Sequence, residues 1–220
     1  MENSKHATQH LAKTYADRGD PNGWFEEFYA HADGDIHQVY WADLSPSPLL
    51  LDWIKEHTEP AQRTAITIGC GLGDDAEALA QHGYKVTAFD ISPSAIAMCR
   101  KRYPNSAVKY LVADLFHLPL EWRRGFDLVY ECNTIQILKG PSRVRALEAI
   151  TNVVAPGGDV LVSCRSRGPG EPPDTFPLAL DQDEIDGFKR AGLTETHFTA
   201  YDDDQDPPVP HFFAVYERPL

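Results

Sequence analysis

Apolar residues recur along the chain with two different spacings, which predict strands and helices in alternation. Runs rich in β-branched and aromatic residues predict strands, the first ending at Ile68 and the next three covering residues 84–91, 107–115 and 125–131. Helical spacing is found over residues 75–82 and 141–153. Strands that alternate with helices in this way predict an α/β fold with a mainly parallel sheet.

The C-terminal part of the chain predicts three more strands and one helix. The strands cover residues 159–165, 194–201 and 211–217. The helix, residues 181–191, starts at Asp181 and has Glu184 three residues later, the spacing of a capping box. The acidic run 202–206 predicts a solvated hairpin tip, because it lacks the glycine and the glutamate of a calcium loop.

Three helices are predicted ahead of the first strand. They cover residues 5–17, residues 22–32 and the stretch from Ser45-Pro46 to His57, with Pro46 at a permitted first-turn position. The second helix carries four aromatic residues at helical spacing, namely Trp24, Phe25, Phe28 and Tyr29. This aromatic face either lines a substrate pocket or docks the helix on the rest of the domain.

The first strand ends in a glycine loop whose sequence, over residues 69–75, is GCGLGDD. Glycine tolerates positive φ and lets backbone N–H groups approach a ligand, next to the unpaired N–H groups of the following helix. The spacing G-x-G-x-G differs from the dinucleotide pattern G-x-G-x-x-G, and Asp74 and Asp75 stand where a pyrophosphate would lie. A positively charged ligand suits these carboxylates better, which favours S-adenosylmethionine over NAD.

Acidic residues end the next three predicted strands. Asp90 lies about 20 residues after Gly69, the spacing at which a carboxylate accepts hydrogen bonds from ribose hydroxyls. Asp114 follows the third strand, where an adenine amino group could be recognised, and Glu131 ends the fourth. Because open α/β sheets bind ligands at the carboxyl ends of their strands, these residues predict one shared site.

Five segments in this order and spacing, GCGLGDD, VTAFDIS, VADLF, FDLVYE and VAPGG, resemble the motifs of class I S-adenosylmethionine-dependent methyltransferases. The resemblance covers about residues 60–220. The upstream segment WADLSPSPLLLDWI, residues 41–54, is similar to the corresponding segment of thiopurine, thiol, halide and tellurite-resistance methyltransferases, in which a tryptophan helps to close the site.

This resemblance implies a Rossmann-like, seven-stranded sheet that is mostly parallel, has its last strand antiparallel and is flanked by helices. It also implies an N-terminal helical lid, residues 1–60, packed on a methyltransferase domain of residues 61–220. The expected cofactor is S-adenosyl-L-methionine. The residues expected to bind it are Trp41, Gly69, Cys70, Gly71, Asp75, Asp90, Ile91, Asp114, Leu115 and Glu131.

The acceptor half of the site is less well defined by the sequence. A soft or ionised acceptor needs no general base, whereas a hydroxyl or amine does, and the candidate bases are His37, His117, Glu131 and His211. Arg165 and Arg167 begin a loop of residues 165–176 that predicts a substrate lid and an anion anchor, with Arg165 also a candidate catalytic residue. The expected substrate contacts are Trp24, Phe28, Gln136, Arg165 and Arg167, with apolar lining from Ile135 and Leu138.

We expect a small-molecule acceptor, with a thiol or another soft or anionic nucleophile favoured over a hydroxyl or amine. Two other classes remain open at this point, an NAD-type oxidoreductase and a non-catalytic protein that binds an adenosyl ligand. Thermal shifts with S-adenosylhomocysteine and NAD would separate them.

Composition narrows the expected partners. The chain has 220 residues, 42% of them hydrophobic, and a net charge of −13, which disfavours nucleic acid; its basic clusters, residues 100–102 and 123–124, are short. No apolar run of about 18 residues or signal-peptide core occurs, which predicts a soluble cytoplasmic protein without membrane contact. The four cysteines lack C-x-x-C spacing, so we expect no metal site. The expected oligomeric state is a monomer or a homodimer.

Overall fold

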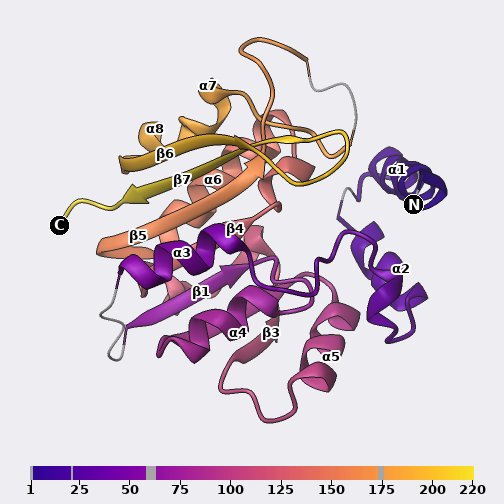
Figure 1. Cartoon of the computed structure of the whole chain (residues 1–220), viewed down its shortest axis with the longest axis horizontal. Helices are drawn as coiled ribbons and strands as arrows, with labels where there is room; N and C mark the ends of the chain where they lie inside the picture. The colour runs from indigo at the N-terminus through magenta and orange to yellow at the C-terminus, as the bar shows by residue number, and fades with distance from the viewer. Residues whose placement is uncertain (1, 21, 58–62, 173–175) are drawn as a thin grey trace.

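A seven-stranded sheet forms the centre of the molecule (Figure 1), in a computed structural model that describes residues 2–20, 22–57, 63–172 and 176–220. The strand order is β3-β2-β1-β4-β5-β7-β6. The strands are β1 (Thr64–Ile68), β2 (Lys85–Asp90), β3 (Lys109–Val112), β4 (Phe126–Cys132), β5 (Val154–Arg165), β6 (Thr194–Asp202) and β7 (Pro210–Glu217).

The first five strands are parallel to one another, and β7 runs antiparallel to both of its neighbours, β5 and β6. Four of the five residues of β1 are buried, as expected for a strand covered on both faces. The predicted fold class, a Rossmann-like sheet that is mostly parallel with its last strand antiparallel, is therefore confirmed.

Helices α3 (Pro48–Glu56), α4 (Asp74–Gln81), α5 (Pro93–Arg102), α6 (Gly140–Val153), α7 (Gln182–Ile185) and α8 (Gly187–Arg190) cover the two faces of the sheet. Two further helices, α1 (Glu2–Asp17) and α2 (Trp24–His31), precede them in the chain. Leu50 of α3, Leu79 of α4 and Ile96 of α5 belong to the core on one face. Leu147 of α6 and Phe188 of α8 belong to the core on the other face.

Several boundaries differ from the sequence prediction. Helix α3 begins at Pro48 after Ser47, so Pro48 and not Pro46 takes the first helical turn. The predicted helix over residues 181–191 is two short helices that meet at Asp186, although the capping box of Asp181 and Glu184 is confirmed. Strand β5 begins at Val154, with an irregular register opposite β4 at its start.

Helices α1 and α2 lie at the end of the sheet where the parallel strands terminate (Figure 1). The N-terminal segment thus lies beside the expected site. The predicted division between residues 60 and 61 lies outside the described residues, so the two-part organisation stays a prediction. Within the described ranges, no helix is long and apolar enough to cross a membrane.

Candidate active site

The glycine loop has the backbone conformation that its sequence predicts. Gly69, Gly71 and Gly73 have φ values of +57°, +51° and +89°, in the left-handed region that favours glycine. A Cβ atom on Gly69 would lie 2.4 Å from Thr134 Oγ1, and one on Gly73 would lie 2.5 Å from Tyr110 Oη. The loop therefore leaves no room for side chains at these two positions, and it brings bare backbone to the ends of β1 and β4.

A buried carboxylate holds this loop in place. Asp90 is 6% exposed at the end of β2; its Oδ2 accepts the Gly71 N–H at 3.0 Å and its Oδ1 accepts the Ser92 N–H at 2.9 Å. Burial raises the pKa of Asp90 to about 6, although the two N–H groups oppose this shift. Cys70 is tied to the same strand, because its N–H donates to the Phe89 carbonyl at 2.9 Å.

Three residues expected to bind the cofactor, Ile91, Asp114 and Leu115, have different environments. Asp114 accepts the Phe116 N–H at 2.9 Å and contacts His117 Nδ1 at 2.6 Å, so it caps the short 3-10 helix Leu115–His117. Leu115 is buried in the core, whereas Ile91 is partly exposed at the end of β2. Asp114 and Ile91 are thus the accessible side chains of this group.

The two carboxylates that follow the glycine loop have partners within the protein. Arg102 donates to both oxygens of Asp74, at 2.8 and 2.9 Å, which neutralises that charge. Asp75 accepts the Ser47 N–H at 2.7 Å and so joins α4 to the start of α3, and burial raises its pKa to about 6. Asp74 is thus paired within the protein, whereas the expectation that Asp75 binds the cofactor stays a prediction.

Aromatic side chains of the N-terminal segment gather beside the glycine loop. Trp41, 37% exposed, stacks on Phe28 with ring centroids 4.0 Å apart, and Trp24 packs edge-on against both Trp41 and Phe176. The Tyr29 hydroxyl lies 3.3 Å from the place that a Cβ on Gly71 would take. The aromatic helix face thus packs on the loop and also leaves part of the Trp41 ring accessible.

Glu26 joins α2 to the donor half of the site, a link that the sequence analysis missed. Its Oε2 accepts the Ser92 hydroxyl at 2.6 Å and the Ser94 N–H at 3.0 Å, and its Oε1 accepts the Ser94 hydroxyl at 2.8 Å. Ser92 also bonds Asp90 through its N–H. A chain of hydrogen bonds therefore runs from the N-terminal helix to the carboxylate beneath the glycine loop.

Glu131 is fully buried at the end of β4. Its Oε1 accepts the Thr134 N–H at 2.5 Å and the Ile135 N–H at 2.9 Å, whereas its Oε2 has no hydrogen-bond partner in the part of the chain described. Burial raises its pKa to about 7. Between these residues, Asn133 has a φ of +62°, a conformation that non-glycine residues adopt rarely and often at functional sites.

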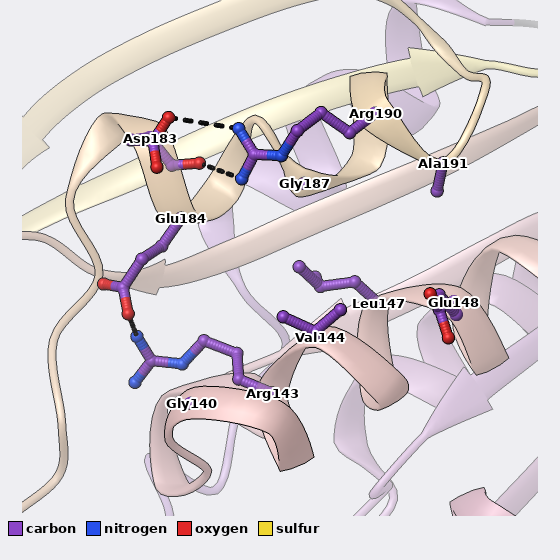
Figure 2. Close-up of a pocket in the computed structure, with 10 residues that line it drawn as sticks. All are labelled: Gly140, Arg143, Val144, Leu147, Glu148, Asp183, Glu184, Gly187, Arg190 and Ala191. Carbon is purple, nitrogen blue, oxygen red and sulfur yellow. Dashed lines mark hydrogen bonds and ion pairs between the residues drawn. The ribbon is translucent and has the colours of Figure 1, made fainter.

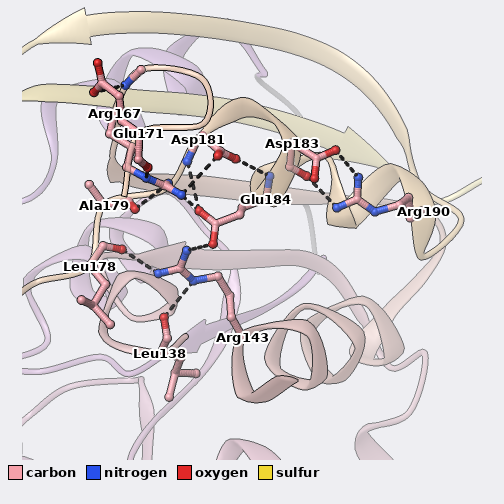
Figure 3. Close-up of polar contacts among 11 residues, drawn as sticks. Leu138, Arg143, Arg167, Glu171, Leu178, Ala179, Asp181, Asp183, Glu184 and Arg190 are labelled. Atoms are coloured by element: carbon pink, nitrogen blue, oxygen red, sulfur yellow. Dashed lines mark hydrogen bonds and ion pairs between the residues drawn. The ribbon is translucent and has the colours of Figure 1, made fainter. Parts of the chain in front are cut away.

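The expected acceptor residues separate into two groups. Gln136 is buried and accepts the Arg165 N–H at 2.7 Å, so it supports the end of β5. Arg167 donates to the Ala179 carbonyl at 2.9 Å and pairs with Asp181 and Glu184 (Figure 3). Its guanidinium thus holds the loop after β5 in place and is paired within the protein, whereas a substrate contact of Arg165 stays a prediction.

The three candidate histidines differ in exposure. His37 is exposed in the 3-10 helix Ile36–Gln38, and the side chain of His117 is 79% exposed. His211 is 7% exposed at the start of β7, in register with Arg165 of β5. Of the three, His211 alone has a buried, fixed side chain at the carboxyl edge of the sheet.

A separate groove of about 340 Å³ lies between α6 and the α7–α8 pair (Figure 2). Val144 and Leu147 of α6 line it, opposite Asp183 and Arg190. It contains none of the strand-end residues described above, so it lies apart from the candidate active site. Within the described ranges, no cluster of three or more His, Cys, Asp or Glu side chains could hold a metal ion.

Comparison with known proteins connects this site to a class of enzymes. Residues 65–158 match the family described as "Methyltransferase domain". The chain is 32% identical over 125 residues to "Ubiquinone biosynthesis O-methyltransferase" of Azotobacter vinelandii, covering 56% of this chain and 53% of that protein. The chain therefore spans about half the length of the curated relatives it matches.

Solved structures share the fold. One, described by "Conversion of a Disulfide Bond into a Thioacetal Group during Echinomycin Biosynthesis", has a TM-score of 0.67 and 23% identity, covering 81% of this chain and 84% of that one. The N-methyltransferase NodS from Bradyrhizobium japonicum, in complex with S-adenosylhomocysteine, has a TM-score of 0.63 and 20% identity, covering 78% of this chain and 85% of that one.

The part of the chain that matches the methyltransferase-domain family, residues 65–158, contains the glycine loop, Asp90 and Glu131. The relation to the thiopurine and tellurite-resistance branch finds no such support in these comparisons.

Glu131 gives a pH-dependent stability that can be measured. An isolated glutamate ionises near pH ~4.3, but the folded protein holds the Glu131 proton up to a pKa of about 7. The folded state therefore binds more protons across this range, so the free energy of unfolding falls as pH rises through it, by about 4 kcal/mol from this group. Glu131→Gln should flatten that fall in urea denaturation between pH 5 and pH 8.

Glu121, an exposed glutamate, provides the control. Glu121→Gln should keep the wild-type dependence of the unfolding free energy on pH, because Glu131, Asp75 and Asp90 are unchanged in this variant. Parallel curves for Glu131→Gln and wild type would mean that Glu131 is ionised in the folded state at pH 5.

Proposed function

We propose that the chain transfers the methyl group of S-adenosylmethionine to a hydroxyl oxygen of a small molecule. The observation that carries the proposal is the unit formed by the glycine loop and Asp90, at the carboxyl edge of a sheet of methyltransferase topology. Oxygen as the acceptor atom is supported by the relatives, which are ubiquinone biosynthesis O-methyltransferases. The expected thiol acceptor rests on the segments WADLSPSPLLLDWI and GCGLGDD, on Ile135 and Leu138 as apolar lining and on Arg165 and Arg167 as anion anchors. Because Arg167 is paired with Asp181 and Glu184, we place the thiol second.

The donor half follows from hydrogen-bond capacity. The Asp90 carboxylate accepts the Gly71 and Ser92 N–H groups and has further lone pairs, so it can still accept hydrogen bonds from ribose hydroxyls. Gly69 and Gly71 offer close backbone approach, and Asp114 is accessible for the adenine amino group. When bound, S-adenosylmethionine supplies a methyl group on a sulfonium, an electrophile that needs no activation by the protein.

The N-terminal segment serves as a lid in this proposal. Glu26 bonds Ser92, and the Tyr29 hydroxyl lies beside Gly71, so α2 packs on the residues that bind the methyl donor in this proposal. The stacked rings of Trp41 and Phe28 form an aromatic wall beside these residues. Such a wall suits a flat, partly apolar acceptor and excludes water from the reacting atoms. Arg165 at the end of β5 and Asn133 at the end of β4 provide polar groups near the same edge.

Asp90→Asn tests the donor site. The variant loses a charged acceptor for the ribose hydroxyls, which should weaken binding of S-adenosylhomocysteine by about 1.5–3 kcal/mol, or roughly 10- to 100-fold. Isothermal titration calorimetry measures this directly. Asp127 is a useful control, because it accepts the Thr64 N–H at 2.7 Å at the opposite edge of the sheet. Asp127→Asn should lower stability and leave the affinity unchanged; equal affinities for Asp90→Asn and wild type would exclude the proposed ribose contact.

Glu26→Gln tests the lid. Loss of the charge weakens three hydrogen bonds to Ser92 and Ser94, so amide exchange in α2 should accelerate and S-adenosylhomocysteine should bind about tenfold more weakly. Glu27, on the same helix, instead accepts the Tyr15 hydroxyl at 2.5 Å. Glu27→Gln should therefore leave the affinity as it is. If ligand does not slow exchange in wild-type α2, the segment is not a lid.

An acceptor panel tests the reaction itself. Phenols, catechols, thiols and amines are supplied with S-adenosylmethionine, and release of S-adenosylhomocysteine is measured while mass spectrometry locates the methyl group. We expect O-methylated phenols or catechols, with Asp90→Asn as the background. Turnover of thiols alone would replace the proposal with the thiol acceptor, and the absence of turnover for a folded protein that binds the donor would favour a binding function.

A further inference from the structure

We propose that His211 is the general base that takes the proton of the acceptor hydroxyl, and that the β6–β7 hairpin holds its ring for this purpose. The inference rests on the proposed O-methyl transfer and names a residue for it.

The place of His211 follows from the topology of the sheet. Strand β7 runs antiparallel to β5, so its first residues lie beside the last residues of β5, at the edge where the parallel strands end (Figure 1). His211 is in register with Arg165 on one side and Tyr201 on the other. Paired residues in an antiparallel ladder point to the same face, so these three side chains lie on one face of the sheet.

The hydrogen bond of His211 defines which ring nitrogen is free. Its Nδ1 lies 2.8 Å from the Val209 carbonyl oxygen, which can only accept, so Nδ1 carries the proton. In the neutral ring the lone pair is then on Nε2, for which the described part of the chain provides no hydrogen bond. A base needs this arrangement, with one nitrogen fixed by an orienting group and the other available to the substrate.

The hairpin tip fixes the orienting group. The Val209 carbonyl also accepts the Asp203 N–H at 3.0 Å, and Asp203 Oδ1 accepts the Val209 N–H at 2.9 Å and the Gln205 N–H at 3.1 Å. The Tyr201 ring stacks on His211, with centroids 5.4 Å apart and an angle of 24° between the planes. The acidic run that the sequence predicts as a solvated tip therefore contains a carboxylate that orders the turn around this histidine.

Two charged residues are neighbours of His211 at this edge of the sheet. Asp203 Oδ2 lies 3.8 Å from Nδ1, so a carboxylate is beside the ring that takes up the proton. Arg165 is the register partner of His211 on β5, and a cationic side chain at this edge suits the negative charge that develops on the acceptor oxygen.

The proposed step balances as follows. A lone pair of the hydroxyl oxygen forms the new O–C bond, the C–S bond of the donor breaks, and its electron pair remains on the sulfur, which becomes a neutral thioether. The hydroxyl proton moves to His211 Nε2. The imidazolium then releases this proton to water, which restores the neutral ring.

Acceptors of graded acidity separate a base from a merely structural residue. An ordinary phenol ionises near pH ~10 and needs a base at neutral pH, whereas a nitrophenol is already largely ionised there. His211→Asn is the best variant, because its amide N–H group can still donate to Val209. We expect kcat with the phenol to fall about 10²- to 10³-fold, and kcat with the nitrophenol to fall less than about fivefold. Asp203→Asn should cause a smaller loss, with the same dependence on the acceptor.

His197 is the matched control, since it is an exposed histidine of the same hairpin that contacts Thr199. His197→Gln should leave both rates unchanged. Calorimetry with S-adenosylhomocysteine establishes that each variant is folded, and His211→Gln serves as the second variant if His211→Asn is not. Equal losses with both acceptors, or no loss with the phenol, would overturn the role of His211 even while wild-type O-methylation stands. Failure of the wild type to methylate any hydroxyl would overturn the proposed function itself.

Discussion

The carboxylate of Asp90 organises the donor half of this domain. One oxygen holds the backbone of Gly71 and the other holds the backbone of Ser92, so a single side chain fixes both the glycine loop and the entrance to α5. Through the Ser92 hydroxyl the same connection reaches Glu26 of the N-terminal segment. The loop, the helix and the segment over them can thus keep a common geometry only while this buried carboxylate has its hydrogen bonds.

Burial of carboxylates at this site destabilises their ionised forms at neutral pH. Burial raises the pKa of Asp75 and Asp90 to about 6 and that of Glu131 to about 7, and all three lie near the carboxyl edge of the sheet. Their ionised forms are therefore less stable here than in water. A cationic ligand bound nearby would stabilise these anions and lower their pKa values.

The sequence predicted the strands and the donor loop well because both depend on local signals. The three glycines of residues 69–73 all have positive φ, and the β-branched run of β1 forms a buried strand. The sequence pattern does not predict helix α5, because its apolar residues form only a short stretch, Ala95 to Cys99, that is followed by the basic residues 100–102. The helix over residues 181–191 divides at Asp186, where Gly187 packs closely against Leu147, a contact between residues distant in sequence.

Side-chain roles were harder to predict than helices and strands, because they depend on contacts between residues distant in sequence. Arg167 and Asp74 have charges that suggest ligand binding, but their partners, Glu184 and Arg102, come from other elements. Nothing local marks Arg143, which is buried and donates to the Leu138 and Leu178 carbonyls (Figure 3). Only the fold reveals which charges are paired within the protein and which remain for a substrate.

The acceptor half shows most clearly how the fold creates chemistry that the sequence leaves open. His211 was one of several histidines without a distinguishing neighbour in the sequence, and it becomes distinct because an antiparallel strand returns it to the edge where β4 and β5 end. A thiol ionises near pH ~8.5 and gains little from an oriented imidazole, whereas a phenol near ~10 gains much. A buried histidine with its Nδ1 proton committed to a carbonyl is therefore of more use to an oxygen acceptor than to a sulfur one. The hydrogen bonds of Asp203 and Val209 hold the turn that orients this histidine.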